Sequence, residues 1–241
     1  MGAVQQKGRY AAGALIPLRD TARSSTAPVV TVALIAINVL VFLHETALGP
    51  HLERFVFAYG LVPARFVHWP GDPLDPARFL PLFTSMFWHG GWLHLLGNML
   101  YLWIFGDNVE DKLGHGRFLI FYLLGGLGAA LVETAFAPES RLPTIGASGA
   151  IAAVLGAYLV SFPRSRVLTF IPIFFLPWFV EIPAVVYLAG WFAVQIASGF
   201  VSLNSPESGG TAWWAHVGGF VAGIVLVKLL ARARPRPLRA Y

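Results

Sequence analysis

Two polar residues open separate apolar stretches of this chain, and their types are those of a nucleophile and its base. Ser148 stands in the run GASGA at 146–150, and His216 opens the last apolar stretch. A hydroxyl and an imidazole are unfavourable in a lipid-compatible segment, so residues of this kind are functional candidates. In acyl transfer the serine hydroxyl attacks a carbonyl carbon and the imidazole takes its proton. The pair therefore predicts a nucleophilic site inside a membrane.

A second pair of polar residues, His94 and Asn98, could complete such a site. They are four residues apart and therefore share one face of a helix. In the topology predicted below, their helix descends from the same membrane side as the one that Ser148 opens. These two side chains and the backbone N–H of Ser148 could hold the oxyanion of a tetrahedral intermediate.

Each of these residues also has a purely structural interpretation. A serine among small residues often serves helix packing and bonds back to its own helix. A histidine in a spanning helix can bridge two helices, and His94 with Asn98 could link helices through hydrogen bonds. From spacing and topology alone, the catalytic and structural interpretations both stay open.

The composition is that of a membrane protein. Hydrophobic residues make up 56% and charged residues 12% of the chain, with a mean hydropathy of +0.66, whereas soluble domains contain about 25% charged residues. Apolar runs near the ~20 residues of a spanning helix lie at roughly 27–43, 79–106, 117–137, 145–163, 167–200 and 212–231. We predict an all-α, six-helix membrane domain over residues 27–231. A polar N-terminal segment, 1–26, precedes it and a basic tail, 232–241, follows it.

The basic residues predict the orientation. Most of the 17 Lys and Arg residues lie before the first helix, between the second and third, between the fourth and fifth, and after the sixth. Because cytoplasmic loops keep an excess of Lys and Arg, we expect both termini in the cytoplasm. Basic residues spread in this way favour contact with the lipid bilayer and indicate no nucleic-acid partner.

Residues 1–26 show no cleavable signal peptide, and the short N-terminus favours a bacterial plasma membrane.

The fourth helix is predicted to be too short to cross the bilayer. From Ser148 to Pro163 it would be roughly 24 Å long, against a hydrocarbon core of about 30 Å. Residues 138–147 would then enter the membrane as irregular backbone, and Ser148 would lie at a helix N-terminus in a hydrated recess. Small residues are expected to let the fourth and sixth helices approach closely, and these are Gly149, Ala152, Ala153, Gly156, Gly219 and Gly223.

Two further segments carry expectations. Residues 48–80, rich in Pro and aromatic side chains, are expected to be structured and to lie in the lipid interface. The fifth helix is expected at roughly 180–199, with Glu181 near its cytoplasmic start as an interface or capping residue.

Taken together, the motifs resemble the rhomboid family of intramembrane serine proteases. The resemblance is carried by GASG at 146–149, by His94 and Asn98 within HGGWLHLLGNMLYLWIFGDNVED, and by AHVGGF at 215–220, and it covers about residues 30–230. It implies a protein with a six-helix fold that cleaves transmembrane segments of other proteins near their outer ends. We expect no metal and no cofactor.

The resemblance also implies roles for individual residues. Ser148 would be the nucleophile and His216 the general base, a dyad without an acidic third member. His94, Asn98 and the Ser148 N–H would form the oxyanion site. His89 would have a structural or water-holding role, and the fifth helix, through Trp191 and Phe192, would border the path by which a substrate enters. Four glycines would support the site: Gly146, Gly149, Gly219 and Gly223.

Two positions depart from the family pattern. Many members carry a tyrosine one helical turn after the serine, stacked on the histidine, where this chain has Ala152. Trp213 or Trp214 is then the candidate to support the His216 ring. A Trp-Arg pair found in the first external loop of some members is also missing.

Other chemistries fit less well. The chain has no HExxH run for a zinc protease, no aspartate in a predicted span for an aspartyl mechanism, and no G-x-S-x-G elbow, since position 150 is alanine. The main alternative is a non-proteolytic rhomboid-like protein that binds or escorts membrane clients. A transporter or channel ranks third, because the sequence shows neither internal symmetry nor paired broken helices.

Overall fold

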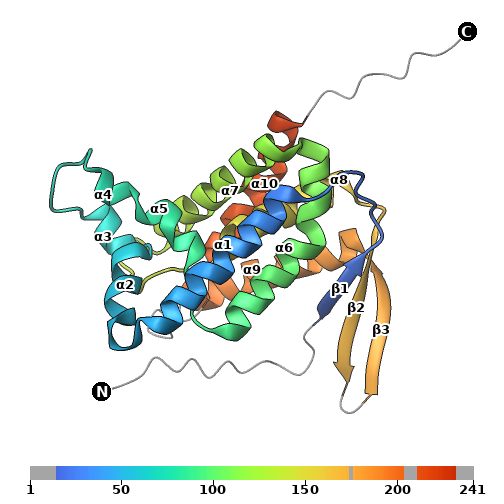
Figure 1. The fold of residues 1–241 in the computed structure, drawn as a ribbon, viewed down its shortest axis with the longest axis horizontal. Helices are drawn as coiled ribbons and strands as arrows, with labels where there is room; N and C mark the ends of the chain where they lie inside the picture. Colours follow the sequence, from blue (N-terminus) through green and yellow to red (C-terminus); the bar gives the residue numbers. More distant parts are fainter. Residues whose placement is uncertain (1–14, 174–175, 204–210, 232–241) are drawn as a thin grey trace, which may run out of the picture.

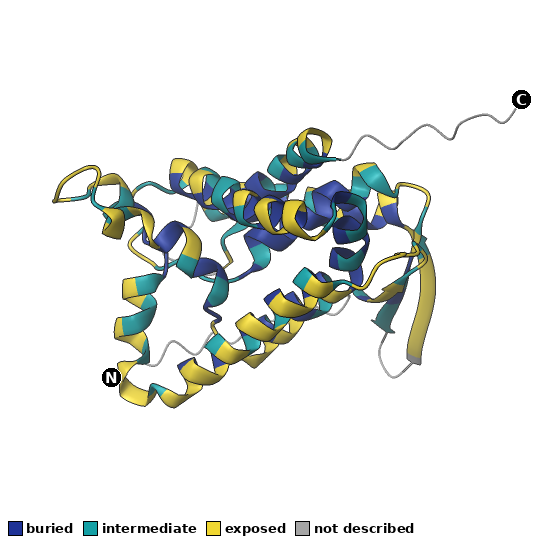
Figure 2. Ribbon diagram, turned by 45° about the horizontal axis from the view of Figure 1, so that its top comes forward, coloured by how far each residue is buried: buried dark blue, intermediate teal, exposed yellow. Residues whose placement is uncertain are grey.

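The computed structural model describes residues 15–173, 176–203 and 211–231. Its core is a bundle of long helices (Figure 1), which comprises α1 (Val29–Ala47), α6 (Trp92–Leu113), α7 (His115–Phe136), α8 (Ser148–Ser161), α9 (Ala184–Leu203) and α10 (Trp213–Leu230). Helix α8 packs against α6, α7, α9 and α10. Its residues from Gly149 to Tyr158 are all buried, and Figure 2 shows the buried residues gathered inside the bundle. The helix that Ser148 opens is therefore the central one.

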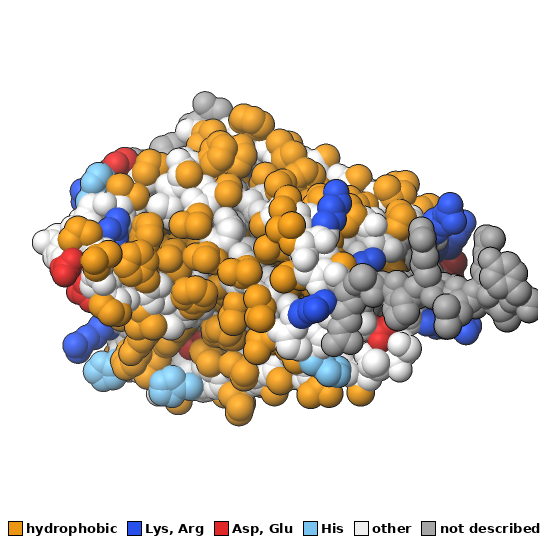
Figure 3. Space-filling model, turned by 90° about the horizontal axis from the view of Figure 1, so that it is seen from above, with side chains coloured by type: hydrophobic (Ala, Val, Ile, Leu, Met, Phe, Trp, Pro, Cys, Tyr) orange, Lys and Arg blue, Asp and Glu red, His pale blue; other side chains and the backbone are white. Residues whose placement is uncertain are grey.

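The molecule is a mostly helical, polytopic membrane protein. Among the described helices, α1, α7, α9 and α10 are long and apolar enough to cross a membrane. Helix α6 is as long, but its last turns carry Asp107, Glu110 and Asp111. Helix α8 has 14 residues, which corresponds to roughly 21 Å, so it is short as expected. Figure 3 shows an extensive apolar surface with most charged side chains towards its ends, as lipid contact requires.

The connection between α1 and α6 is structured, as expected for residues 48–80. It holds a 3-10 turn (Gly49–His51), α2 (Leu52–Tyr59), α3 (Pro63–Val67), α4 (Pro76–Phe79), α5 (Pro81–Thr84) and a second 3-10 turn (Ser85–Phe87). Aromatic rings join its two ends, with Tyr59 stacked on Trp88 at 5.7 Å between ring centroids. The placement of this segment in the lipid interface stays a prediction.

The all-α prediction was wrong, because a three-stranded antiparallel sheet lies beside the bundle (Figure 1). Its strands are β1 (Ile16–Asp20), β2 (Arg166–Ile173) and β3 (Leu176–Pro183), in the order β1-β2-β3. Register pairs Phe170 with Phe179 across the hairpin and Ile16 with Phe170 across the outer pair. The apolar run at 167–200 had been assigned to a helix, but hydropathy does not distinguish a strand from a helix. Pro172, Pro177 and Pro183 disfavour a helix before residue 184.

Glu181 was also placed wrongly, since it lies in β3, opposite Leu168, and not at the start of a helix. Helix α9 begins at Ala184, directly after Pro183.

Part of the polar N-terminal segment belongs to the folded unit. Strand β1 packs on α6, and Asp20 at its end accepts hydrogen bonds from the Tyr158 hydroxyl and, at 3.1 Å, from the Asn108 side-chain amide. Residues 1–14 and the basic tail at 232–241 lie outside the described residues, so the domain limits at 26 and 231 stay predictions.

Candidate active site

Ser148 is the first residue of α8, at the end of an irregular segment. Residues 137–147 form no helix. Gly146 has a φ of +126°, a backbone conformation that residues with a Cβ rarely adopt. The Gly146 N–H donates to the Ser85 carbonyl at 2.9 Å and ties this segment to the connection before α6. Ala147 is the N-cap, and no side chain caps the helix. The Ser148 hydroxyl is therefore available for another partner.

That partner is His216, on the first turn of α10. The distance from Ser148 Oγ to His216 Nε2 is 2.8 Å, although 68 residues separate them in the chain. His216 is only 8% exposed. The two residues that could act as nucleophile and base are thus in direct hydrogen-bond contact.

Small residues bring the two helices close enough for this contact. A Cβ added to Gly219 would lie 2.1 Å from the Gly149 carbonyl oxygen and 3.3 Å from the Ala152 Cβ. These distances leave no room for larger side chains where α8 and α10 meet. Ala152, at the position that departs from the family pattern, is fully buried and lies next to Gly219 of α10.

Gln195 is a third polar residue at the site, and the sequence interpretation missed it. The distance from its Oε1 to His216 Nδ1 is 2.7 Å, and the Gln195 side chain is buried at 5% exposure. The available signal was an amide side chain within an apolar helix, which is a functional candidate on general grounds. Only the rotation of α9 about its axis reveals that this amide faces His216.

Aromatic rings surround the imidazole. The Trp191 ring is tilted over His216 at 5.8 Å and the Trp213 ring meets it edge-on at 6.2 Å between centroids. Trp214, the other candidate, stacks on Phe136 at 3.9 Å instead. Support for the His216 ring thus comes from α9 as well as from α10.

His94 and Asn98 face the segment just before Ser148. A Cβ on Gly146 would lie 2.7 Å from His94 Nε2 and 3.6 Å from Asn98 Nδ2. The Gly90 N–H donates to His94 Nδ1 at 3.3 Å, so in the neutral ring the proton is on Nε2, which points toward Gly146. Asn98 is 8% exposed, and its Nδ2 has no hydrogen-bond partner among the described residues. Two N–H groups are thus directed toward the backbone beside the nucleophile.

His89 supports His94 from the loop before α6. Its backbone N–H donates to the two carboxylate oxygens of Glu45 at 3.1 and 3.2 Å, which fixes the loop to α1. Its ring meets the His94 ring edge-on, with centroids 5.1 Å apart. This contact is consistent with a structural role for His89.

The residues suggested as a substrate gate pack against α10. Phe192 stacks on Phe220 at 4.3 Å and Trp191 on the same ring at 6.1 Å. One turn earlier on α9, the Tyr187 hydroxyl is 2.7 Å from the Tyr101 hydroxyl of α6. The gate role itself stays a prediction.

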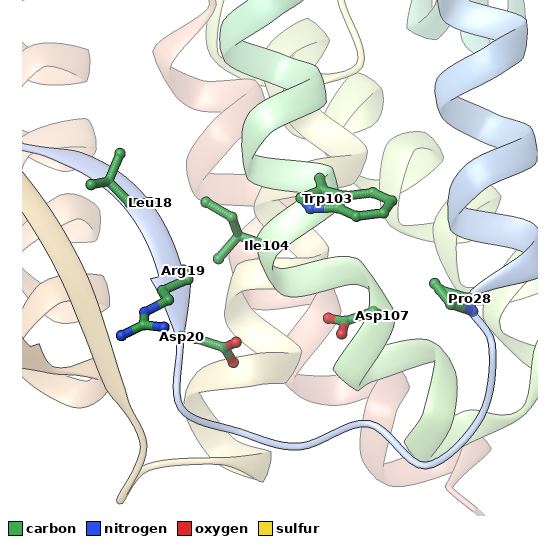
Figure 4. Close-up of a pocket in the computed structure, with 7 residues that line it drawn as sticks. All are labelled: Leu18, Arg19, Asp20, Pro28, Trp103, Ile104 and Asp107. Carbon is green, nitrogen blue, oxygen red and sulfur yellow. The ribbon is translucent and has the colours of Figure 1, made fainter.

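A cavity of about 140 Å³ lies away from these residues, between β1 and α6 (Figure 4). Asp20, Trp103 and Asp107 line it, and the latter two are on α6 beyond the turns that carry His94 and Asn98. Within the described ranges, no group of three His, Cys, Asp or Glu residues could hold a metal ion.

A family model and the similar proteins all indicate the same family. The model of a family described as "Rhomboid domain" matches residues 76–233, more than half of the chain. Rhomboid protein 1, mitochondrial, of Saccharomyces cerevisiae is 29% identical over 218 residues, which cover 86% of this chain and 56% of the yeast protein.

Two further relatives match over shorter regions. Presenilin-associated rhomboid-like protein A, mitochondrial, of Danio rerio is 33% identical over 119 residues, or 48% of this chain and 29% of that protein. Rhomboid protease GluP of Bacillus subtilis is 44% identical over 78 residues, or 32% of this chain and 15% of that protein. The matched regions thus span little more than half of the yeast relative and less than a third of the other two.

Proposed function

The chain belongs to the rhomboid family, and from this premise we propose that it is an intramembrane serine endopeptidase. The observation that carries the proposal is the 2.8 Å contact between Ser148 Oγ and His216 Nε2 at the start of the central helix. A family member that only bound its clients would have no need for a nucleophile in contact with its base. The name of one relative, rhomboid protease GluP, supports the same activity.

In the proposed reaction, Ser148 Oγ attacks the scissile carbonyl carbon while His216 Nε2 takes the hydroxyl proton. The oxyanion is held by His94 Nε2–H and Asn98 Nδ2–H, which both lie next to Gly146, and by the backbone N–H of Ser148 itself. His216 then gives its proton to the leaving amine. Water hydrolyses the acyl-enzyme with His216 again acting as the base.

The proposed substrates are transmembrane segments of other membrane proteins, cut near their outer ends. With both termini in the cytoplasm, helices α6, α8 and α10 all begin on the outer side, and α6 and α8 complete a bundle of six membrane helices with α1, α7, α9 and α10. A short α8 leaves its N-terminus below the outer surface, where water can reach Ser148 through the irregular segment before it. Substrates must unwind locally to expose a carbonyl, which favours small or helix-breaking residues at the cut. A bacterial plasma membrane is the proposed location.

The test uses purified full-length protein in detergent with a model single-span substrate. Wild type should cleave it, whereas Ser148→Ala and His216→Ala should not. A fluorophosphonate probe should label wild type and leave Ser148→Ala unlabelled. Cleavage by Ser148→Ala at the wild-type rate would overturn the serine assignment. Substrate binding by wild type without any cleavage would favour the non-proteolytic alternative.

A further inference from the structure

His216 has hydrogen-bond contacts on both ring nitrogens, and the second leads to a residue with no role in the reaction described above. Nε2 meets Ser148 Oγ at 2.8 Å and Nδ1 meets Gln195 Oε1 at 2.7 Å. All three residues come from different helices, α8, α10 and α9. A residue in this position determines which tautomer the imidazole adopts.

The two partners of the Gln195 amide determine which of its atoms donates and which accepts. Its Nε2 donates to the Trp191 carbonyl at 3.3 Å, and a carbonyl oxygen only accepts hydrogen bonds. Oε1 is therefore the Gln195 atom that faces His216, and because it too only accepts, Nδ1 must carry the proton. The lone pair then lies on Nε2, where it accepts the hydroxyl proton of Ser148. The chain of donors runs one way, from Ser148 through His216 and Gln195 to Trp191.

We propose that Gln195 is a positioning residue that holds His216 in the Nδ1–H tautomer and fixes the plane of its ring. The proposal rests on the proposed peptidase function and extends the Ser148–His216 pair by a third, neutral member. In the opposite tautomer, Nε2 would carry the proton and could not act as the base toward Ser148. A neutral amide serves this purpose without placing a carboxylate among apolar helices, where an ionised group is strongly disfavoured.

The immediate surroundings of Gln195 are compatible with this role. The amide is 5% exposed, so water does not compete for its hydrogen bonds. Trp191, one turn earlier on α9, both accepts from the amide and lies over the His216 ring at 5.8 Å. Two residues in adjacent turns of α9, Trp191 and Gln195, thus contact both His216 and each other.

Among the described residues, two titratable side chains lie near the site. His94 on α6 lies next to Gly146, two residues before Ser148. From α7, Glu133 accepts a hydrogen bond from the backbone of the neighbouring residue, Ala215, at 2.8 Å. The variants described next leave both groups unchanged, so a difference between the variants reports on position 195.

The experiment measures kcat, KM and the pH profile of cleavage for wild type and three full-length variants. Gln195→Leu removes the acceptor at similar volume, and Gln195→Glu keeps an acceptor and adds a negative charge. Val194→Leu changes the neighbouring side chain on α9, which is 58% exposed on the outside of the bundle, and serves as the matched control. Thermal unfolding in detergent shows whether each variant folds.

We expect Gln195→Leu to lower kcat on the order of 10- to 100-fold with little change in KM, since a buried N–H loses its acceptor. The acid limb of its pH profile should move to lower pH, because the protonated ring loses a partner. In Gln195→Glu the acid limb should move to higher pH and cleavage at neutral pH should persist, because a carboxylate stabilises the protonated ring. Val194→Leu should match wild type.

Equal kcat for Gln195→Leu and Val194→Leu would overturn the proposal, as would loss of activity in both Gln195 variants with an unmoved acid limb. If Gln195→Leu fails to fold, the pH profile of Gln195→Glu alone decides. Failure of the peptidase function itself gives a different result, because wild type would then not cleave, or Ser148→Ala would cleave equally well.

Discussion

Gly223 of α10 lies directly against the backbone of Ala153 in α8, so close that a Cβ at position 223 would be 1.9 Å from the Ala153 carbonyl oxygen. This distance is far below van der Waals contact, and the atom in the way belongs to the backbone, which cannot rotate away. The approach of the two backbones determines how α10, and with it His216, sits on α8.

Gly223→Ala should therefore destabilise the protein and reduce cleavage together. Overpacking of a close helix contact costs about 1–3 kcal/mol, and the separation of the helices would also lengthen the contact from Ser148 to His216. Thermal unfolding in detergent and a cleavage assay would measure both effects. Gly190→Ala on α9 is the matched control, since a Cβ there meets nothing within 4 Å. Equal unfolding temperatures for the two variants would contradict the prediction.

Glu133 should act as a cap for the helix that carries His216. Helix α10 has no side-chain cap of its own at Ala212, and the Glu133 carboxylate of α7 accepts from the Ala215 N–H at 2.8 Å. Glu133→Ala should cost about 0.5–2 kcal/mol of stability, the usual range for a lost cap, and should lower kcat because the first turn of α10 is loosened. Glu133→Gln keeps an acceptor and should lose less of both. Unfolding and cleavage assays on the two variants measure these losses. If Glu133→Gln lost as much stability and kcat as Glu133→Ala, Glu133 would not act as a cap.

Asp20 should make the stability of the three-stranded sheet depend on pH. Burial, opposed by the hydrogen bond from Tyr158 and assisted by the nearby charge of Asp107, raises the pKa of Asp20 to about 6. Because the folded protein binds this proton more tightly than the unfolded chain, the contribution to stability is present below about pH 4 and is lost as pH rises through about 6. The unfolding temperature of wild type should fall over this range, and that of Asp20→Asn should fall less. Parallel curves for the two proteins would contradict the assignment.

The sequence was informative about the site because polar groups stand out in apolar helices. The order and direction of their helices placed Ser148 and His216 on the same membrane side, the glycines at 219 and 223 indicated how the helices would meet, and the family resemblance paired the two residues. The shortness of α8 also followed from the small number of residues between Ser148 and the basic residues after it, Arg164 and Arg166.

What could not be predicted depends on tertiary contacts or on ambiguous patterns. The apolar run at 167–200 fits strands as well as a helix by hydropathy, and its prolines at 172, 177 and 183 were not used as a signal against a helix, so β2 and β3 were not anticipated. Their pairing with β1 from the other end of the chain was not anticipated either. Gln195 was missed because its significance comes from the rotation of α9, which a helix with few other polar residues does not reveal.

The hydrogen bonding of Asn98 distinguishes most clearly between a catalytic and a structural role for the polar residues on α6. Its Nδ2 is buried and has no hydrogen-bond partner in the described part of the chain, so it contributes a desolvation penalty to the resting protein. A residue that served to link helices would be hydrogen-bonded in the folded state. Under the proposed function, Asn98 is a donor whose partner is the oxyanion of the reaction.

Asn98→Leu, which has a similar volume, should therefore leave the unfolding temperature unchanged or raise it. The same change should lower kcat by about 10²–10³-fold, the usual effect of removing one oxyanion donor, with a smaller change in KM. The measurements are thermal unfolding and steady-state cleavage of a single-span substrate, with Leu96→Ala as the control, since Leu96 lies on the same helix at 58% exposure. A fall in the unfolding temperature at unchanged kcat would assign Asn98 to helix packing and remove it from the oxyanion site.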